Sequence, residues 1–130
     1  MKSKLKNSGS VFLMVVFVIA LLSGLVAGML QINTEEIQLV YNQICAAEAL
    51  ATAEAGLNDA LSEIRTDSGW TEGFTDKAFN SGSYTVDVND SEITSTGTSS
   101  QGFVAKISAD ITIGGTSPYV IRIDNLRINE

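Results

Sequence analysis

Hydrophobic and polar positions divide the chain into an uncharged N-terminal run, a stretch of helical period and a C-terminal stretch of period two. Residues 11–30 read VFLMVVFVIALLSGLVAGML and include no charged side chain. An α-helix of twenty residues is about 30 Å long, which matches the hydrocarbon thickness of a bilayer. The pattern therefore predicts a membrane-spanning helix over residues 10–32.

The charges on either side of this run predict its orientation. Lys2, Lys4 and Lys6 precede it, and Glu35 and Glu36 follow it. Because basic flanks stay on the cytoplasmic side of a membrane, we expect a cytoplasmic N-terminus and an extracytoplasmic remainder. The alternative is a secretory signal cleaved near residues 26–28, but the apolar run is longer than such signals have.

Helical periodicity continues beyond the predicted span. No proline interrupts residues 11–65, so one helix of about 55 residues is expected, with an amphipathic half from residue 33 to 65. One apolar stripe runs along this half and is expected to cover the domain's own sheet. The stripe consists of Leu39, Ala46, Leu50, Ala53, Leu57, Leu61 and Ile64.

Two other groups on the helix are predicted to pack against neighbouring chains. Gly24 and Gly28 have the small-x-x-x-small spacing that lets helices approach closely in lipid, and they also predict a local loosening of the helix. A second apolar face, rotated away from the stripe, is expected to contact other subunits, since a helix that is apolar on two sides needs two partners. It consists of Ile37, Tyr41 and Ile44, joined by Cys45. A single domain wrapping both sides is the alternative.

Period two begins at residue 83 and predicts an antiparallel sheet over residues 83–130. Apolar and polar residues alternate over 84–89, 103–113 and 119–123, and residues 93–97 predict a weaker strand. The apolar phase shifts by one between Ile123 and Leu126, which predicts a β-bulge near Asp124 and Asn125.

Residues 66–82 are rich in Gly, Ser, Thr and Asp and are interpreted as a connecting loop. We expect Trp70, Phe74 and Phe79 to anchor this loop to the core rather than to bind a ligand. The predicted fold class is thus α+β, with one long N-terminal helix packed on a small antiparallel sheet. Residues 33–130 form a single extracytoplasmic domain in this interpretation.

Composition excludes several kinds of chemistry. The chain has 15 acidic and 8 basic residues, and its basic residues outside the head are scattered, which argues against nucleic acid as a partner. Histidine is absent and Cys45 is the single cysteine, so no Ser-His-Asp or Cys-His arrangement, intrachain disulfide or histidine zinc site can form. We expect neither an enzyme nor a resident cofactor or metal. Cys45 is interpreted as a small packed helix residue, with a reactive thiol as the alternative.

A cluster of oxygen-bearing side chains is the one candidate for a cation. It comprises Asp87, Asn89, Asp90 and Glu92, which offer the oxygen ligands that calcium prefers. The cluster lacks the spacing and glycine of an EF-hand, and a solvated turn is the preferred interpretation.

Several features together resemble the type IV pilin superfamily, in particular its minor pilins and pseudopilins of the PilX type. They are the basic leader ending in Gly9, the uncharged helix, the segment AAEALATAEAGLNDALSEIR at 46–65, and ITSTG at 93–97 in a strand-rich tail. The resemblance implies that residues 1–9 are a leader, that a prepilin peptidase cuts after Gly9 and methylates Ser10, and that the chain starts in the inner membrane. It implies assembly with other pilin or pseudopilin subunits into a type IV pilus, or into a type II secretion or competence pseudopilus. A membrane-anchored extracytoplasmic binding module is the alternative function.

One position departs from the family pattern. Most members of the superfamily carry glutamate at the fifth mature position, which is thought to pair with the N-terminal amine of a neighbouring subunit. Met14 occupies that position here. In this respect the chain resembles subunits placed at the filament tip, where an unpaired carboxylate in hydrocarbon would be costly.

Overall fold

The computed structural model describes the backbone of residues 2–129 and the side chains of residues 8–129. The chain divides into two compact units, residues 1–41 and residues 42–130. The side chains of Lys2, Lys4 and Lys6, on which the predicted orientation depends, lie outside the described residues. Over the described range, helix α1 (Lys2–Thr66) is followed by β1 (Phe74–Phe79), β2 (Gly82–Asn89), β3 (Glu92–Thr98), β4 (Val104–Gly114) and β5 (Val120–Asn129).

Helix α1 confirms the prediction of one long helix and begins before the predicted residue 11. It contains 65 residues and stays α-helical through Gly24 and Gly28, so the loosening predicted at these glycines is wrong. In the first unit the helix is long and apolar enough to cross a membrane, and its side chains from Val11 to Leu30 are exposed. The segment that the sequence assigns to lipid therefore makes no packing contact that buries it within its own chain.

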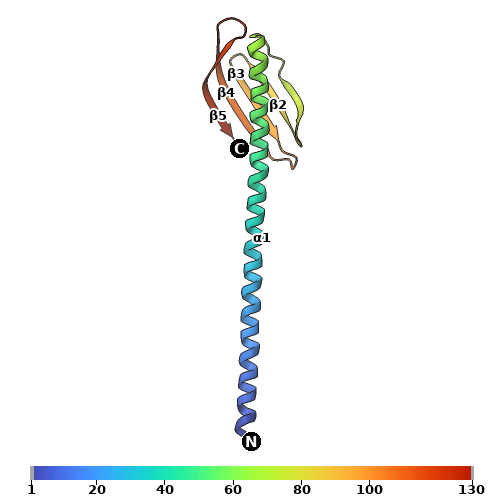
Figure 1. The fold of residues 1–130 in the computed structure, drawn as a ribbon, viewed down its shortest axis with the longest axis vertical. Coiled ribbons are helices and arrows are strands. Elements are labelled where there is room, and N and C mark those ends of the chain that lie inside the picture. The colour runs from blue at the N-terminus through green and yellow to red at the C-terminus, as the bar shows by residue number, and fades with distance from the viewer. Residues whose placement is uncertain (1, 130) are drawn as a thin grey trace. The chain divides into compact units, whose positions relative to one another are not determined.

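The second unit confirms the predicted α+β fold. Its five described strands form one antiparallel sheet in the order β1-β2-β3-β4-β5, and the last turns of α1 pack on one face of that sheet (Figure 1). The weaker strand predicted at 93–97 is β3, at the centre of the sheet. The predicted bulge is also present, because Asp110 pairs with Asn125 whereas Ile111 pairs with Ile123, which leaves Asp124 as the extra residue.

The interpretation of residues 66–82 as a connecting loop is wrong in part. Strand β1 occupies Phe74–Phe79, and β2 begins at Gly82. The strand pairs irregularly, with a register shift between Phe74 and Lys77 and a positive φ of 50° at Asp76. A short, bulged edge strand has no clean period of two, which explains why alternation did not reveal it.

The prediction that aromatic side chains anchor this segment is wrong for Phe79, which is 36 % exposed and lies outside the buried core cluster and the residues packed against it. The prediction is confirmed for Trp70 and Phe74. Both pack against the buried core cluster. The ring centroids of Trp70 and Phe74 are 5.1 Å apart, and Phe74 meets Tyr84 edge-on at 6.0 Å. Such tilted and edge-on contacts are the favoured geometries for aromatic pairs.

The face that α1 turns toward the sheet overlaps only in part with the predicted stripe. Leu39 is 62 % exposed, and Leu50 and Leu61 are only half-buried. Three members of the predicted stripe, Ala53, Leu57 and Ile64, are buried as predicted. The other buried apolar positions of the helix are small residues that the stripe did not include: Cys45, Ala49 and Ala60. The buried face is therefore rotated from the leucines toward the alanines, because small side chains let the helix lie closer to the sheet.

This close approach is concentrated on β3. A methyl group added at Gly97 would lie 2.3 Å from the carbonyl oxygen of Ala49 and 2.3 Å from the amide nitrogen of Ala53. The hydroxyl of Ser95 donates a buried hydrogen bond of 2.7 Å to the carbonyl oxygen of Ala53. A glycine in a strand interior commonly marks such an approach by another backbone. The contact between helix and sheet thus depends on backbone atoms as well as side chains.

Gly97→Ala is expected to lower the free energy of unfolding by about 3 kcal/mol, because backbone atoms of α1 would have to move to admit the methyl group. Gly114→Ala is the matched control, since nothing lies within 4 Å of a methyl group added there. Denaturant unfolding of the full chain in detergent, followed by the fluorescence of Trp70, measures both variants. Equal stabilities for the two variants would contradict the close approach.

Candidate assembly surfaces

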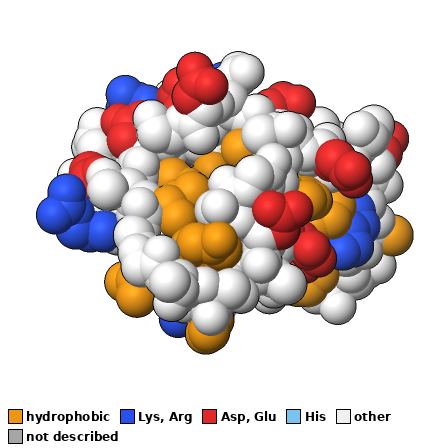
Figure 2. Space-filling model, turned by 90° about the horizontal axis from the view of Figure 1, so that it is seen from above, with side chains coloured by type: hydrophobic (Ala, Val, Ile, Leu, Met, Phe, Trp, Pro, Cys, Tyr) orange, Lys and Arg blue, Asp and Glu red, His pale blue; other side chains and the backbone are white. Residues whose placement is uncertain are grey.

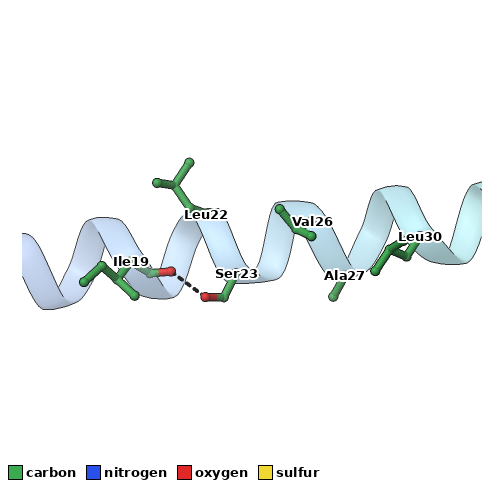
Figure 3. A pocket seen from close by; sticks show the side chains of 6 residues that line it. All are labelled: Ile19, Leu22, Ser23, Val26, Ala27 and Leu30. Carbon is green, nitrogen blue, oxygen red and sulfur yellow. Dashed lines mark hydrogen bonds between the residues drawn. The ribbon is translucent and has the colours of Figure 1, made fainter.

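The uncharged apolar part of α1, residues 11–30, presents an open apolar groove rather than an enclosed cavity. Figure 3 shows the side chains that line it: Ile19, Leu22, Ser23, Val26, Ala27 and Leu30. The hydroxyl of Ser23 donates a hydrogen bond of 2.8 Å to the carbonyl oxygen of Ile19, so it is satisfied within the helix. A hydroxyl bonded in this way can lie in hydrocarbon without an outside partner. This surface is suited to lipid or to an apolar helix.

The small residues predicted for helix packing lie on this same part of α1. Apart from the neighbouring backbone of the helix itself, no described atom lies within 4 Å of a methyl group added at Gly24 or Gly28, so both glycines leave room for another chain. Their role as a packing site stays a prediction. Gly9 and Ser10, the predicted processing residues, are exposed residues of α1, and Met14 is exposed as well.

The second predicted apolar face of α1 is partly corrected. Ile37, Tyr41 and Ile44 are exposed, as a surface for other subunits requires. Cys45 does not belong with them, since it is 3 % exposed and lies on the face that packs on the sheet. The interpretation of Cys45 as a packed helix residue is confirmed, and its burial protects the thiol from reaction.

Strand β5 carries an apolar surface that the sequence did not reveal. Ile123, Leu126 and Ile128 are 45 %, 50 % and 49 % exposed. Their strand partners on β4 are buried core residues, so alternation alone assigned all of them to the core. The width of the sheet is what would have predicted this exposure. A helix about 10 Å across covers only two or three strands, which are spaced about 4.8 Å apart, and a five-stranded sheet is wider than that.

Asp59 links α1 to β1 and β2, at the edge of the sheet opposite β5. Its carboxylate forms an ion pair with Lys77 of β1 and accepts a hydrogen bond of 2.5 Å from the hydroxyl of Tyr84 on β2. The ammonium of Lys77 also lies 4.3 Å from the centroid of the Phe74 ring, a cation–π contact. The hydrogen bonds from Lys77 and then Tyr84 lower the pKa of Asp59 below its ordinary value of 3.8. The same bond with Asp59 raises the pKa of Lys77.

Glu48 joins the helix to two turns of the sheet. Its carboxylate accepts a hydrogen bond of 2.8 Å from the hydroxyl of Ser81, between β1 and β2, and one of 3.3 Å from the backbone amide of Ser100, between β3 and β4. The bond from Ser81, followed by that from Ser100, lowers the pKa of Glu48. Glu48 and Asp59 thus fix the position of this part of α1 along the sheet.

The oxygen cluster considered for calcium lies at a β-turn. Asn89 ends β2 and Glu92 begins β3, so Asp90 is a turn residue, with a positive φ of 50°. The carboxylate of Glu92 is engaged by the guanidinium of Arg127 at 2.7 Å. Among the side chains that the structure describes, no group of three or more cysteine, aspartate or glutamate residues could hold a metal ion. The arrangement is that of a solvated turn.

Several charged side chains of the second unit form ion pairs with one another. Arg122 contacts Asp124 at 2.6 Å, and Arg127 contacts both Glu92 and Asp110. On the face seen in Figure 2, acidic and basic side chains are interspersed around hydrophobic ones.

No family model, curated protein or solved structure matches the chain. One long apolar N-terminal helix packed on an antiparallel sheet is nevertheless consistent with a pilin-like fold. Function is therefore inferred from the surfaces described above.

Asp59 is expected to make stability depend on pH in the acidic range. Its pKa is lower in the folded than in the unfolded chain, so its contribution is complete above 3.8 and is lost as the pH falls through the folded value. The unfolding midpoint of Asp59→Asn should therefore fall less steeply on acidification than that of the unchanged protein. Glu54→Gln, which alters an exposed carboxylate of the same helix, should retain the full dependence. Parallel acid dependence in all three chains would exclude a contribution from Asp59.

Proposed function

We propose that this chain is a minor pilin or pseudopilin, a structural subunit that assembles through its N-terminal helix into a pilus or secretion pseudopilus. The observation that carries the proposal is a continuous α1 whose first part exposes an uncharged apolar surface while its last turns pack on a five-stranded sheet. An exposed apolar surface of this length must be covered by lipid or by protein. A filament subunit lies first in lipid and afterwards among other protein subunits.

The resemblance in the N-terminal region implies the order of the steps in the proposed assembly. The chain enters the inner membrane with a cytoplasmic N-terminus, and the leader is removed after Gly9 by a prepilin peptidase. The mature chain then begins at Ser10 and packs against other pilin or pseudopilin subunits. The role proposed is structural rather than catalytic, and it requires no cofactor.

Met14 supports a role among subunits that join a filament without the usual glutamate contact. A methionine at this point adds to the apolar surface of α1 and leaves no carboxylate to be neutralised in hydrocarbon. A position at or near the tip fits this residue, because a tip subunit has no subunit above it. The exposed surfaces of the second unit would then be displayed at the filament end.

Processing is tested by the mass and N-terminal sequence of the protein isolated from its own cells. A chain that starts at Ser10, with or without an N-methyl group, is the expected result. Gly9→Ala should block cleavage and leave an intact chain, whereas Gly24→Ala should be cleaved normally. An intact unchanged protein starting at Met1 would favour the membrane-anchored binding module. A start near Met29 would indicate a secreted domain.

Assembly is tested by a charge in the apolar part of α1. Leu21→Asp should reduce incorporation into filaments at least tenfold, because a carboxylate at the centre of an apolar helix costs about 3 kcal/mol in a membrane-like setting. Leu21→Met keeps the apolar surface and should assemble normally. Incorporation is measured by immunoblotting of sheared or sedimented filaments. Unaltered filaments from Leu21→Asp would refute packing through this helix.

A further inference from the structure

The turn between β2 and β3 contains the tripeptide Asn89-Asp90-Ser91. Asparagine followed two residues later by serine or threonine, with any residue except proline between them, is the acceptor motif for N-linked glycosylation. No other asparagine in the sequence has serine or threonine two residues later. The motif overlaps the oxygen cluster considered for calcium, so this turn carries a pattern that the cation hypothesis does not explain.

The three residues of the motif are accessible in the folded chain. All of them are exposed. Asn89 ends β2 and pairs with Glu92, the first residue of β3, so Asp90 and Ser91 form a two-residue turn. Among the residues that the structure describes, none forms a hydrogen bond with the carboxamide of Asn89. An enzyme can therefore reach this amide nitrogen without first breaking a contact of the side chain.

The side chain of Asn89 projects away from the core. Tyr84 and Val86 of β2 are buried in the core cluster, and Val88 packs against it. Because successive residues of a strand point to opposite faces, Asn89 lies on the face that α1 does not cover. A saccharide attached to Asn89 would thus leave the packing of helix on sheet unchanged.

The turn also lies at the end of the sheet remote from Glu48. The carboxylate of Glu48 bonds to Ser81 and Ser100, which precede β2 and follow β3 at their other ends. Strand β2 has eight residues and is therefore about 26 Å long. A saccharide at the β2–β3 turn would project from the opposite end to the bonds that position α1.

A carboxylate accompanies the acceptor on the same face of the sheet. Asp87 precedes Asn89 by two residues of β2, and both side chains are exposed. An enzyme that handles a diphosphate donor presents cationic groups, and a carboxylate can form a charge-assisted hydrogen bond with such a group. Asp87 therefore offers a recognition point beyond the tripeptide itself.

We propose that Asn89 is an N-glycosylation site and that Asp87 assists its recognition. The amide nitrogen of Asn89 attacks C1 of an oligosaccharide carried on a lipid diphosphate. The N–C1 bond forms and the bond from C1 to the diphosphate oxygen breaks. The lipid diphosphate leaves with the electron pair of that bond, and the nitrogen loses one proton. The inference rests on the proposed function, because the transferase acts on the extracytoplasmic side of the membrane.

Mass spectrometry of the full chain isolated from its own cells tests this site. The tryptic peptide of residues 78–106 should carry a saccharide, and fragmentation that preserves the linkage should locate it at Asn89. Asn89→Gln and Ser91→Ala should each lower the modified fraction at least tenfold, whereas Ser91→Thr keeps the motif and should retain it. An unmodified Asn89 in the unchanged protein, or a saccharide that persists in Asn89→Gln, would overturn the proposal.

Asn80→Gln is the matched control within the same peptide. Asn80 is also an exposed turn asparagine with a positive φ, of 51°, but Gly82 stands two residues after it. This variant should keep the modified fraction of the unchanged protein, and a loss equal to that in Asn89→Gln would overturn the site. Asp87→Asn should lower the fraction severalfold, and an unchanged fraction would overturn the role of Asp87.

The N-terminus of the same samples separates this inference from the proposed function. Chains that start at Ser10 and carry no saccharide would overturn the glycosylation site and leave the filament role standing. Chains that start at Met1 and carry a saccharide at Asn89 would support the site and overturn the processing pathway.

Discussion

The close approach of α1 to β3 is the constraint on which the second unit depends. Gly97 lies against the backbone of Ala49 and Ala53, and Ser95 donates a hydrogen bond to the carbonyl oxygen of Ala53. A helix this near to the sheet presents mainly small residues beside β3, and Leu50 and Leu61 lie at the margins of the contact. Glu48 and Asp59 then hold one flank of the helix to turns and strands of the sheet.

Much of the architecture follows from the sequence because its signals are local. The long helix, the antiparallel sheet and the bulge at Asp124 were each encoded by period or by a change of phase. The rotation of the helix was not, because the leucines dominate any hydrophobic pattern while the glycine and serine that determine the contact lie more than 40 residues later. Strand β1 was not predicted because its pairing is irregular. The exposure of Ile123, Leu126 and Ile128 on β5 was not predicted because it depends on how few strands one helix covers.

Some of the candidate surfaces could be predicted from the sequence, and others could not. Ile37 and Ile44 could be recognised from their helical spacing, and both are exposed. Cys45 has the same local neighbours as Ile44 but faces the sheet, and only the rotation of the helix distinguishes the two. Ile123, Leu126 and Ile128 of β5 are exposed because the helix covers only part of the sheet. A surface of this kind can be identified only from the three-dimensional arrangement.

The strand order has a kinetic consequence. Each strand pairs with the next one along the chain, so the sheet closes through short turns, and low sequence separation between contacts favours rapid folding. The contacts between helix and sheet span much longer stretches: 42 residues separate Ala53 from Ser95, and 52 separate Glu48 from Ser100. Loop closure over such distances costs more entropy. We therefore expect the hairpins to form first and the docking of the helix to limit the rate at which the unit folds.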